Sequence, residues 1–366
     1  MKKKKLIIFM PSIEGGGVEK NLFIISNYLS SKIKNISIIT TGRKYRNIFK
    51  KINFVTPKLL FWQNTSRRIK YFICLLILSS MLLKNKNYVV FAFQANLYCT
   101  LVCKFFGIKI IVRSNSSPSG WSKNFIKKYL YKKILGYTDK IIVNSIDFKK
   151  QFKDFFLVKA YCIYNPLNKE EIIKKSKVNT KLNFFKNKDN CLKIINVARF
   201  TDQKDHFTLM KSLNLLKKKI DFKALIIGRG ANKQKIINYI NENKLNKRVK
   251  LLKFQSNPYK YINSSDIFIL TSKFEGLPNV LLEAMTLKKF VISTNCPTGP
   301  KEILFNGKGG ELVPVGDYEA ISKKILFFKK NQKKSKKKIM FSYKSLHRFD
   351  YKKNLDKYLY IVNSLL

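Results

Sequence analysis

Short apolar runs alternate with segments of helical periodicity along the whole chain, and this pattern most restricts the possible folds. Each run is short enough to be one buried strand. Parallel strands need a crossover connection, which a helix usually supplies. The sequence therefore predicts an α/β chain with parallel sheets in both halves and helices at, for example, 18–30 and 279–287. The predicted strands are 5–10, 36–40, 88–93, 108–112 and 140–144, then 193–197, 223–227, 249–252, 266–270 and 290–293.

A turn near the middle of the chain separates two halves, each of which has the pattern of a Rossmann-like unit. Asn165-Pro166 disfavours helix and marks this turn. The Lys- and Asn-rich segment 169–190 is predicted to be a linker. We therefore expect a first domain over 1–168 and a second over 169–350. The final segment, 351–366, has a helical apolar stripe.

The chain has 366 residues and a net charge of +53, because 74 Lys and Arg face only 21 Asp and Glu. Such an excess implies an anionic partner surface, and three explanations stay open. Biased coding composition can spread lysines over solvated faces, anionic lipid head groups can attract them, or nucleic acid can bind them. Nucleic acid is the least favoured, since no nucleic-acid-binding motif is present. The basic run 329–338 fits a solvated helix end and a membrane-surface contact equally well.

Two apolar segments could be mistaken for membrane segments. The start, 1–10, is expected to be the first strand rather than a signal peptide, because its apolar run is short and no small-residue cleavage site follows. Residues 71–83 would form a helix of about 20 Å, short of a hydrocarbon core of roughly 30 Å. We expect a helix buried in the first domain, with shallow insertion into one leaflet as the alternative.

The six cysteines and two histidines give no metal-binding pattern. No C-x-x-C pair occurs, so a zinc site is not expected. Most of the cysteines lie in apolar runs, which fits buried reduced thiols in a reducing cytoplasm.

Two glutamates flank a predicted strand, turn and helix in the second half. Asp266–Ser272 has the pattern of a buried strand, Gly276–Asn279 that of a turn, and a helix follows. Glu275 lies at the mouth of the turn, and Glu283 lies about one turn into the helix. A helix N-terminus can hold a phosphate, and a carboxylate beside it can accept hydrogen bonds from sugar or ribose hydroxyls.

Two cations and two glycine loops follow strands at comparable positions. Arg199 and Lys204 come two and seven residues after the strand 193–197, where ligands bind in open α/β sheets. Arg can grip phosphate oxygens bidentately, and Lys adds a point charge. Gly15–Gly17 and Gly228–Gly230 allow close backbone approach, although a tight turn without ligand explains either loop. Neither loop is G-x-G-x-x-G, so a dinucleotide site is poorly supported.

In chain order, these motifs resemble the retaining glycosyltransferases of family 4, which have the GT-B fold, and within them the O-antigen, capsule and lipid-linked glycan type. The resemblance is carried by 14–20 (EGGGVEK), 196–200 (NVARF) with 203–206 (QKDH), 228–230 (GRG), 271–285 and 297–303. It implies two Rossmann-like domains whose parallel sheets face each other across a cleft. The first would be the acceptor side and the second would bind the nucleotide sugar, with the 351–366 helix packed back on the first.

The resemblance also implies roles for individual residues. Arg199 and Lys204 would neutralise the donor diphosphate, and Glu275 would bind the transferred sugar or stabilise an oxocarbenium-like state. Glu283 would bind the ribose, and 253–257 would lie beside the base. The implied donor-binding set is Gly16, Gly17, Gly228, Gly276, Leu277, Asn279, Val280 and Glu283. The implied sugar or acceptor contacts are Arg113, Asn115, Thr298, Gly299 and Glu302.

One departure from the family concerns histidine. Many members carry a His after the fourth strand of the first domain, whereas 113–117 here reads RSNSS. Arg113, Ser114 or Asn115 would then take over sugar or acceptor contacts. His206 is predicted to be a helix-start residue rather than a base.

The resemblance implies a peripheral enzyme at the cytoplasmic face of the membrane. It would move a hexose or N-acetylhexosamine, with retention, from a nucleoside-diphosphate sugar (UDP-sugar favoured) to a lipid-linked or glycan acceptor. No cofactor and no metal is expected. A sugar-nucleotide epimerase would want a His in the cleft, and a non-catalytic scaffold would tolerate the loss of Arg199, Lys204, Glu275 or Glu283. A nucleic-acid-binding protein would show steep salt dependence on arbitrary DNA.

Overall fold

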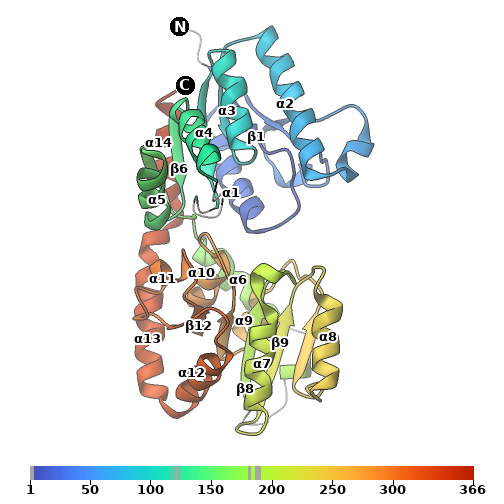
Figure 1. The fold of residues 1–366 in the computed structure, drawn as a ribbon, viewed down its shortest axis with the longest axis vertical. Helices are drawn as coiled ribbons and strands as arrows, with labels where there is room; N and C mark the ends of the chain where they lie inside the picture. Colours follow the sequence, from blue (N-terminus) through green and yellow to red (C-terminus); the bar gives the residue numbers. More distant parts are fainter. Residues whose placement is uncertain (1–3, 117, 119–120, 122–123, 180–182, 186–190) are drawn as a thin grey trace. The chain divides into compact units, whose positions relative to one another are not determined.

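The computed structural model describes residues 4–116, 118, 121, 124–179, 183–185 and 191–366 (Figure 1). The chain forms two compact units, each an α/β unit built on a parallel sheet. Unit 1 is Met1–Pro166 with Tyr351–Leu366, and unit 2 is Leu167–Asp350. The expected α/β class with two parallel sheets is confirmed.

Unit 1 is built on a seven-stranded parallel sheet with the order β3-β2-β1-β4-β5-β6-β7. All five strands predicted for this half are present within a few residues, whereas β3 and β7 were missed. Both missed strands lie at the edges of the sheet and are short and only partly apolar. The strands are β1 (Lys5–Phe9), β2 (Ile36–Ile39), β3 (Ile52–Val55), β4 (Tyr88–Ala92), β5 (Lys109–Ser114), β6 (Lys140–Val143) and β7 (Ala160–Cys162).

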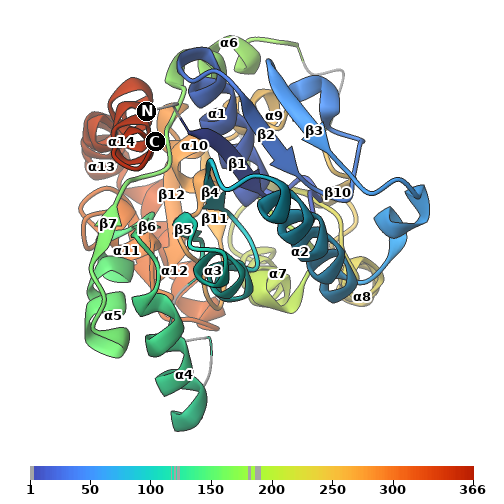
Figure 2. The ribbon, with the colours of Figure 1, turned by 90° about the horizontal axis from the view of Figure 1, so that it is seen from above.

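Helices cover both faces of the unit 1 sheet. Buried residues of α1 and α14 share one hydrophobic cluster, and those of α2 to α5 share the cluster on the other face. Figure 2 shows α2, α3 and α4 together on one side of the strands. The helices are α1 (Gly17–Lys32), α2 (Arg67–Lys84), α3 (Asn96–Phe105), α4 (Phe125–Gly136), α5 (Ile146–Phe156) and α14 (Tyr351–Asn363), with 3₁₀ turns η1 (Arg46–Ile48) and η2 (Leu60–Asn64).

Unit 2 has a six-stranded parallel sheet with the order β10-β9-β8-β11-β12-β13. The five predicted strands are present, and the short edge strand β13 was missed. The strands are β8 (Leu192–Val197), β9 (Phe222–Ile227), β10 (Val249–Leu252), β11 (Ile267–Leu270), β12 (Phe290–Thr294) and β13 (Glu311–Val313).

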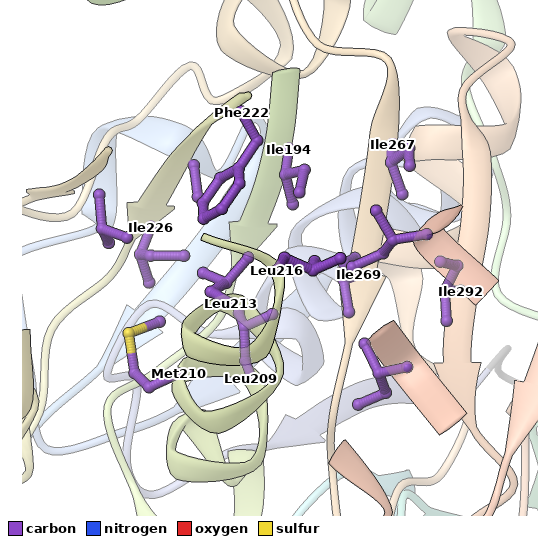
Figure 3. Close-up of a cluster of buried hydrophobic side chains, with 14 of the residues drawn as sticks. Ile194, Leu209, Met210, Leu213, Leu216, Phe222, Ile226, Ile267, Ile269 and Ile292 are labelled. Carbon is purple, nitrogen blue, oxygen red and sulfur yellow. The ribbon is translucent and has the colours of Figure 1, made fainter. Parts of the chain in front are cut away.

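The core of unit 2 lies between this sheet and its helices. Figure 3 shows Leu209, Leu213 and Leu216 of α7 against isoleucines of the strands. These side chains follow the helical spacing on one side and the strand alternation on the other, so the burial follows from the sequence pattern. The helices are α6 (Lys169–Ser176), α7 (His206–Leu216), α8 (Lys233–Glu242), α9 (Tyr259–Asn263), α10 (Asn279–Thr286), α11 (Pro300–Ile303), α12 (Tyr318–Lys330) and α13 (Gln332–Ser345), with 3₁₀ turns η4 (Asn183–Phe185), η5 (Asp202–Lys204) and η6 (Leu346–Phe349).

The predicted linker 169–190 was wrong for its first part. Its residues 169–176 form helix α6, and the side chain of Asn168 caps this helix by accepting from the backbone N–H of Glu171. Ile172 is buried, so the helix packs on unit 2 through one apolar position despite its lysines. Residues 180–182 and 186–190 of the predicted linker lie outside the described residues.

The most apolar segment of unit 1 forms α2, which buries Cys74, Leu78 and Leu82 against the sheet. Among the described residues, no helix is long and apolar enough to cross a membrane.

Candidate active site

An ion pair lies at the carboxyl edge of the unit 2 sheet. The Nζ of Lys204, at the end of η5, lies 2.5 Å from Oε1 of Glu275, and the two side chains are only 14% and 7% exposed. The hydroxyl of Ser272 donates to the same carboxylate oxygen at 2.6 Å. Two donors from two loops therefore fix the Glu275 carboxylate with little access to water.

Hydrogen bonds join the loop after β8 to the loop after β11. The backbone N–H of Lys273 donates to the carbonyl of Gln203 at 2.8 Å, and the side-chain amide of Gln203 donates to the carbonyl of Phe274 at 2.9 Å. The hydroxyl of Thr271 donates to the carbonyl of Lys204 at 3.0 Å. These hydrogen bonds between the two loops fix the position of Lys204 relative to Glu275.

The loop after β12 supports Glu275 from the other side. The hydroxyl of Thr298 donates to the Glu275 carbonyl. Gly299 has φ +87°, and a Cβ there would lie 2.0 Å from the carbonyl oxygen of Gly276. Only glycine permits this approach. The predicted residues Thr298, Gly299, Gly276 and Glu275 are therefore brought together.

Arg199 lies at the same edge of the sheet and is exposed. Among the described residues, no carboxylate forms an ion pair with it. The glycine loop after β9 packs beside it, and a Cβ on Gly228 would lie 2.0 Å from the carbonyl oxygen of Ala198. A Cβ on Gly230 would lie 2.3 Å from that of Phe200. Backbone packing thus already requires these glycines, and a nucleotide contact of Gly228 stays a prediction.

Helix α10 begins beside Glu275 without a side-chain cap. Its N-cap residue is Pro278, which has no side-chain oxygen, and no acidic residue lies in its first turn. The partial positive charge at this helix start is therefore not offset by its own side chains. Asn279 and Val280 form the first turn and are half-buried, while Leu277 is buried beneath the turn.

Glu283 lies farther along α10 and is buried. The hydroxyl of Tyr259 donates to Oε1 of Glu283 at 3.4 Å. Tyr259 was not among the predicted site residues, since a lone tyrosine after Asn257-Pro258 gives no signal in the sequence. Glu302, on α11, is half-buried, and its carbonyl accepts from Arg348. The ribose and acceptor roles of Glu283 and Glu302 stay predictions.

Comparison with known proteins shows which family unit 2 matches. Residues 178–345 match the family described as glycosyl transferases group 1. Unit 2 of the chain therefore carries the domain of the group 1 glycosyltransferases. The family expected from its motifs is confirmed.

Two relatives show how far the likeness extends. An N-acetylgalactosamine-N,N'-diacetylbacillosaminyl-diphospho-undecaprenol 4-alpha-N-acetylgalactosaminyltransferase of Campylobacter jejuni is 28% identical over 85% of this chain and 86% of its own. An uncharacterized glycosyltransferase of Methanocaldococcus jannaschii is 36% identical, but the match spans only 48% of this chain and 44% of the relative.

Solved structures share the fold. A glycosyltransferase from Rickettsia africae superposes with a TM-score of 0.81 at 20% identity, covering 100% of this chain and 99% of that one. Anabaena HepE, in complex with UDP and glucose, superposes with a TM-score of 0.79 at 16% identity, covering 99% of this chain and 100% of that one. At these identities the likeness shows the fold alone.

His206 of this glycosyltransferase is a structural residue at the start of α7, as predicted. Its Nε2 lies 3.1 Å from Oδ1 of Asn196, and the Asn196 amide donates to the carbonyl of Ile269 at 2.8 Å. Because that amide is the donor, Oδ1 must accept from His206 Nε2–H. Burial, with a smaller contribution from the charge of Lys204, lowers the pKa of His206 to about 4. The ring is therefore neutral at neutral pH.

Cys296 is a buried thiol close to the ion pair. Burial, followed by the charge of Glu275, raises the pKa of its thiol to about 12. The thiolate that reacts or binds metal is therefore not populated at neutral pH.

In unit 1, the start of α1 differs from that of α10. Glu19 reaches back so that its Oε2 accepts from the N–H of Gly16 at 2.9 Å and its Oε1 from the N–H of Glu14 at 3.4 Å. This buried carboxylate occupies amides that a phosphate would need. The donor contacts of Gly16 and Gly17 stay predictions, and a phosphate there would have to displace Glu19.

Arg113 is completely buried in unit 1. Its Nε donates to the hydroxyl of Tyr358 at 2.9 Å, and a second nitrogen donates to Oδ1 of Asn165 at 2.7 Å. A third donates to Oδ1 of Asn115. Arg113 thus joins β5 to α14 and has no surface for a sugar in this conformation, whereas Asn115 is half-buried.

Proposed function

We propose that this glycosyltransferase moves a hexose or N-acetylhexosamine, with retention, from a UDP-sugar to a lipid-linked or glycan acceptor in cell-surface polysaccharide assembly. The observation that carries the proposal is the fixed Lys204–Glu275 pair, with an exposed Arg199 at the same edge of the sheet. Related names support it. The Campylobacter relative is named for an undecaprenol-diphosphate-linked acceptor, and an Erwinia amylovora relative for amylovoran biosynthesis.

Arg199 and Lys204 are the cations proposed to stabilise the diphosphate leaving group. Transfer from a nucleotide sugar develops negative charge on the departing diphosphate, and oriented positive charge is usually the largest catalytic contribution. Arg199 offers a bidentate fork. Lys204 has three N–H donors, so it can keep Glu275 and still donate to a phosphate oxygen. The uncapped start of α10 adds amide dipoles at the same edge.

Glu275 is the residue proposed to act on the transferred sugar. A carboxylate beside the anomeric centre stabilises an oxocarbenium-like state, as carboxylates do in glycoside hydrolysis. Ser272 and Lys204 hold this carboxylate before the donor arrives, so little reorganisation is needed. In the same proposal, Glu283 binds the ribose, unit 1 binds the acceptor, and no metal or cofactor takes part.

The test is release of nucleoside diphosphate by the purified chain from a panel of UDP-, GDP- and ADP-sugars, with and without lipid extract as acceptor. We expect turnover of one donor, unchanged by EDTA, and a product that keeps the anomeric configuration in its NMR spectrum. Lys204→Ala should reduce turnover by about 10²-fold or more, the scale for losing one transition-state contact.

A matched control separates this effect from the loss of any lysine. Lys175 forms an exposed pair with Glu171 at 2.5 Å in the same unit, so Lys175→Ala should keep full turnover. Equal turnover in the two variants would refute the assigned role of Lys204. If no donor is bound or turned over under any condition, a non-catalytic scaffold becomes the better explanation.

A further inference from the structure

We infer that the outer face of helices α2, α3 and α4 of unit 1 docks on an anionic lipid bilayer. The inference rests on the proposed function, in which the acceptor is lipid-linked, and it assigns the surface that would meet the membrane. Each of the three helices carries two apolar stripes, whereas a helix that covers a soluble sheet needs only one.

The inner stripes pack on the sheet. Buried side chains of α2, α3 and α4 belong to the same hydrophobic cluster, and neighbouring helices contact each other. Figure 2 shows the three helices on the same side of the strands. Their outward faces therefore form one continuous side of unit 1.

The outer stripes are exposed and follow helical spacing. On α2, exposed apolar residues recur three, four and seven residues apart, and on α3 three and four apart. On α4 they occupy two adjacent pairs one turn apart. The outer stripes are Ile69, Phe72, Leu76 and Leu83 on α2, Tyr98, Leu101 and Phe105 on α3, and Phe125, Ile126, Tyr129 and Leu130 on α4. A monomeric soluble protein rarely exposes so many large apolar side chains on one side.

The three helices themselves carry charge of a single sign, and Arg67, at the start of α2, forms an ion pair with Glu14. From Lys20 to Thr138 the sequence has 22 Lys and Arg and not one Asp or Glu, so all 21 acidic residues of the chain lie elsewhere. Lysines alternate with the outer stripe of α4 at positions 127, 128, 132 and 133. Large apolar side chains between lysines are typical of helices that lie in a membrane interface.

The same two properties disfavour other occupants. A second copy of this face would bring positive charge against positive charge. Nucleic acid would match the charge, but its phosphates would leave Leu76, Phe105 and Ile126 without an apolar partner. An anionic bilayer satisfies both, since head groups attract the lysines and acyl chains take the apolar side chains. No described helix can cross the membrane, so the contact is shallow.

The test is co-sedimentation of the full chain with vesicles of neutral phosphatidylcholine or of phosphatidylcholine with phosphatidylglycerol. We expect binding to the anionic vesicles only. A triple variant with Leu76→Ser, Phe105→Ser and Ile126→Ser removes one side chain from each helix, and these are 55%, 84% and 73% exposed, so the fold should persist. Its partition onto anionic vesicles should fall at least tenfold.

The control is a triple variant on other surfaces, with Leu215→Ser, Val315→Ser and Tyr360→Ser, which should bind like the parent chain. Equal binding of the two triple variants would overturn the inference, because adhesion would then come from net charge alone. If the parent chain self-associates and only the first triple variant loses this, the face binds a second copy and the inference is overturned. If the parent chain binds random duplex DNA and only the first triple variant loses this, the face binds nucleic acid and the inference is likewise overturned.

Donor turnover, measured in the same preparations without vesicles, separates this inference from the proposed function. If the first triple variant loses vesicle binding but keeps normal donor turnover, the result supports both the docking inference and the transferase proposal. Turnover without any vesicle binding by the parent chain refutes only the docking, and vesicle binding without turnover of any donor refutes only the transferase proposal.

Discussion

Replacing Lys204 by methionine should destabilise unit 2 as well as stop catalysis. The change keeps the apolar stem but leaves Glu275, 7% exposed, without its cation. Breaking a buried pair from one side costs about 3–5 kcal/mol. The hydroxyl of Ser272 still donates to Glu275, so we expect the lower end, about 3 kcal/mol of unfolding free energy.

The partner variant tests the cause. In Lys204→Met with Glu275→Gln, no charge remains buried, and neutral replacement of a buried pair is often tolerated. We expect the double variant to lie within about 1 kcal/mol of the parent chain. Donor turnover should stay lost in both variants, because the cation and the carboxylate are both proposed to act on the donor.

Urea unfolding followed by circular dichroism measures this cycle. With a slope of about 2 kcal/mol per molar urea, 3 kcal/mol moves the midpoint by roughly 1.5 M. Trp62 and Trp121, the two tryptophans of the chain, lie in unit 1. Their fluorescence transition therefore serves as an internal control and should not move. A single variant as stable as the parent, or a double variant no more stable than Lys204→Met, would refute the reasoning.

Two further predictions concern stability. The pKa of His206 is lowered to about 4, so the unfolded chain binds this proton more tightly and stability falls as pH drops below about 6.5. Between pH 7 and 5 this loss is about 2 kcal/mol; His206→Gln should flatten the pH dependence of unfolding by that amount, and an unchanged pH dependence in this variant would refute the assignment. Gly299→Ala should cost several kcal/mol and reduce turnover, because its Cβ meets the carbonyl of Gly276. Gly316→Ala has a similar positive φ of +82° and open space, so its smaller loss of thermal stability measures backbone strain alone. Equal losses in the two glycine variants would remove the argument from close packing.

The sequence predicted the sheets well because the central strands are continuous apolar runs buried on both faces. It missed β3, β7 and β13, which lie at sheet edges where fewer apolar residues are needed. It also took Lys169–Ser176 for linker, because lysines obscured a helix that needs only a few buried positions.

The site was predicted in part. The motif spacing placed Lys204 and Glu275 on loops at one edge of the sheet, but it gave no reason for their direct contact or for the support from Ser272. The sequence pattern also did not predict which site residues are buried. Arg113 was predicted from its place after a strand, yet its partners Tyr358 and Asn165 are distant in sequence, so no local pattern could show that it is enclosed.

The two glycine-containing helix starts show why motif and geometry must be considered together. Gly15–Gly17 before α1 has the composition of a phosphate loop, but Glu19, three residues after Gly16, accepts from the N–H of Gly16. The start of α10 has the poorer glycine signal, yet its N-cap is Pro278 and its first turn carries no acid. An anion gains most at a helix start whose first turn carries no acidic residue, and where Lys204 and Arg199 lie at the same edge. The affinity of the chain for inorganic pyrophosphate should therefore be lower in Arg199→Ala and unchanged in Glu19→Gln. Stronger pyrophosphate binding in Glu19→Gln would instead place an anion at the start of α1.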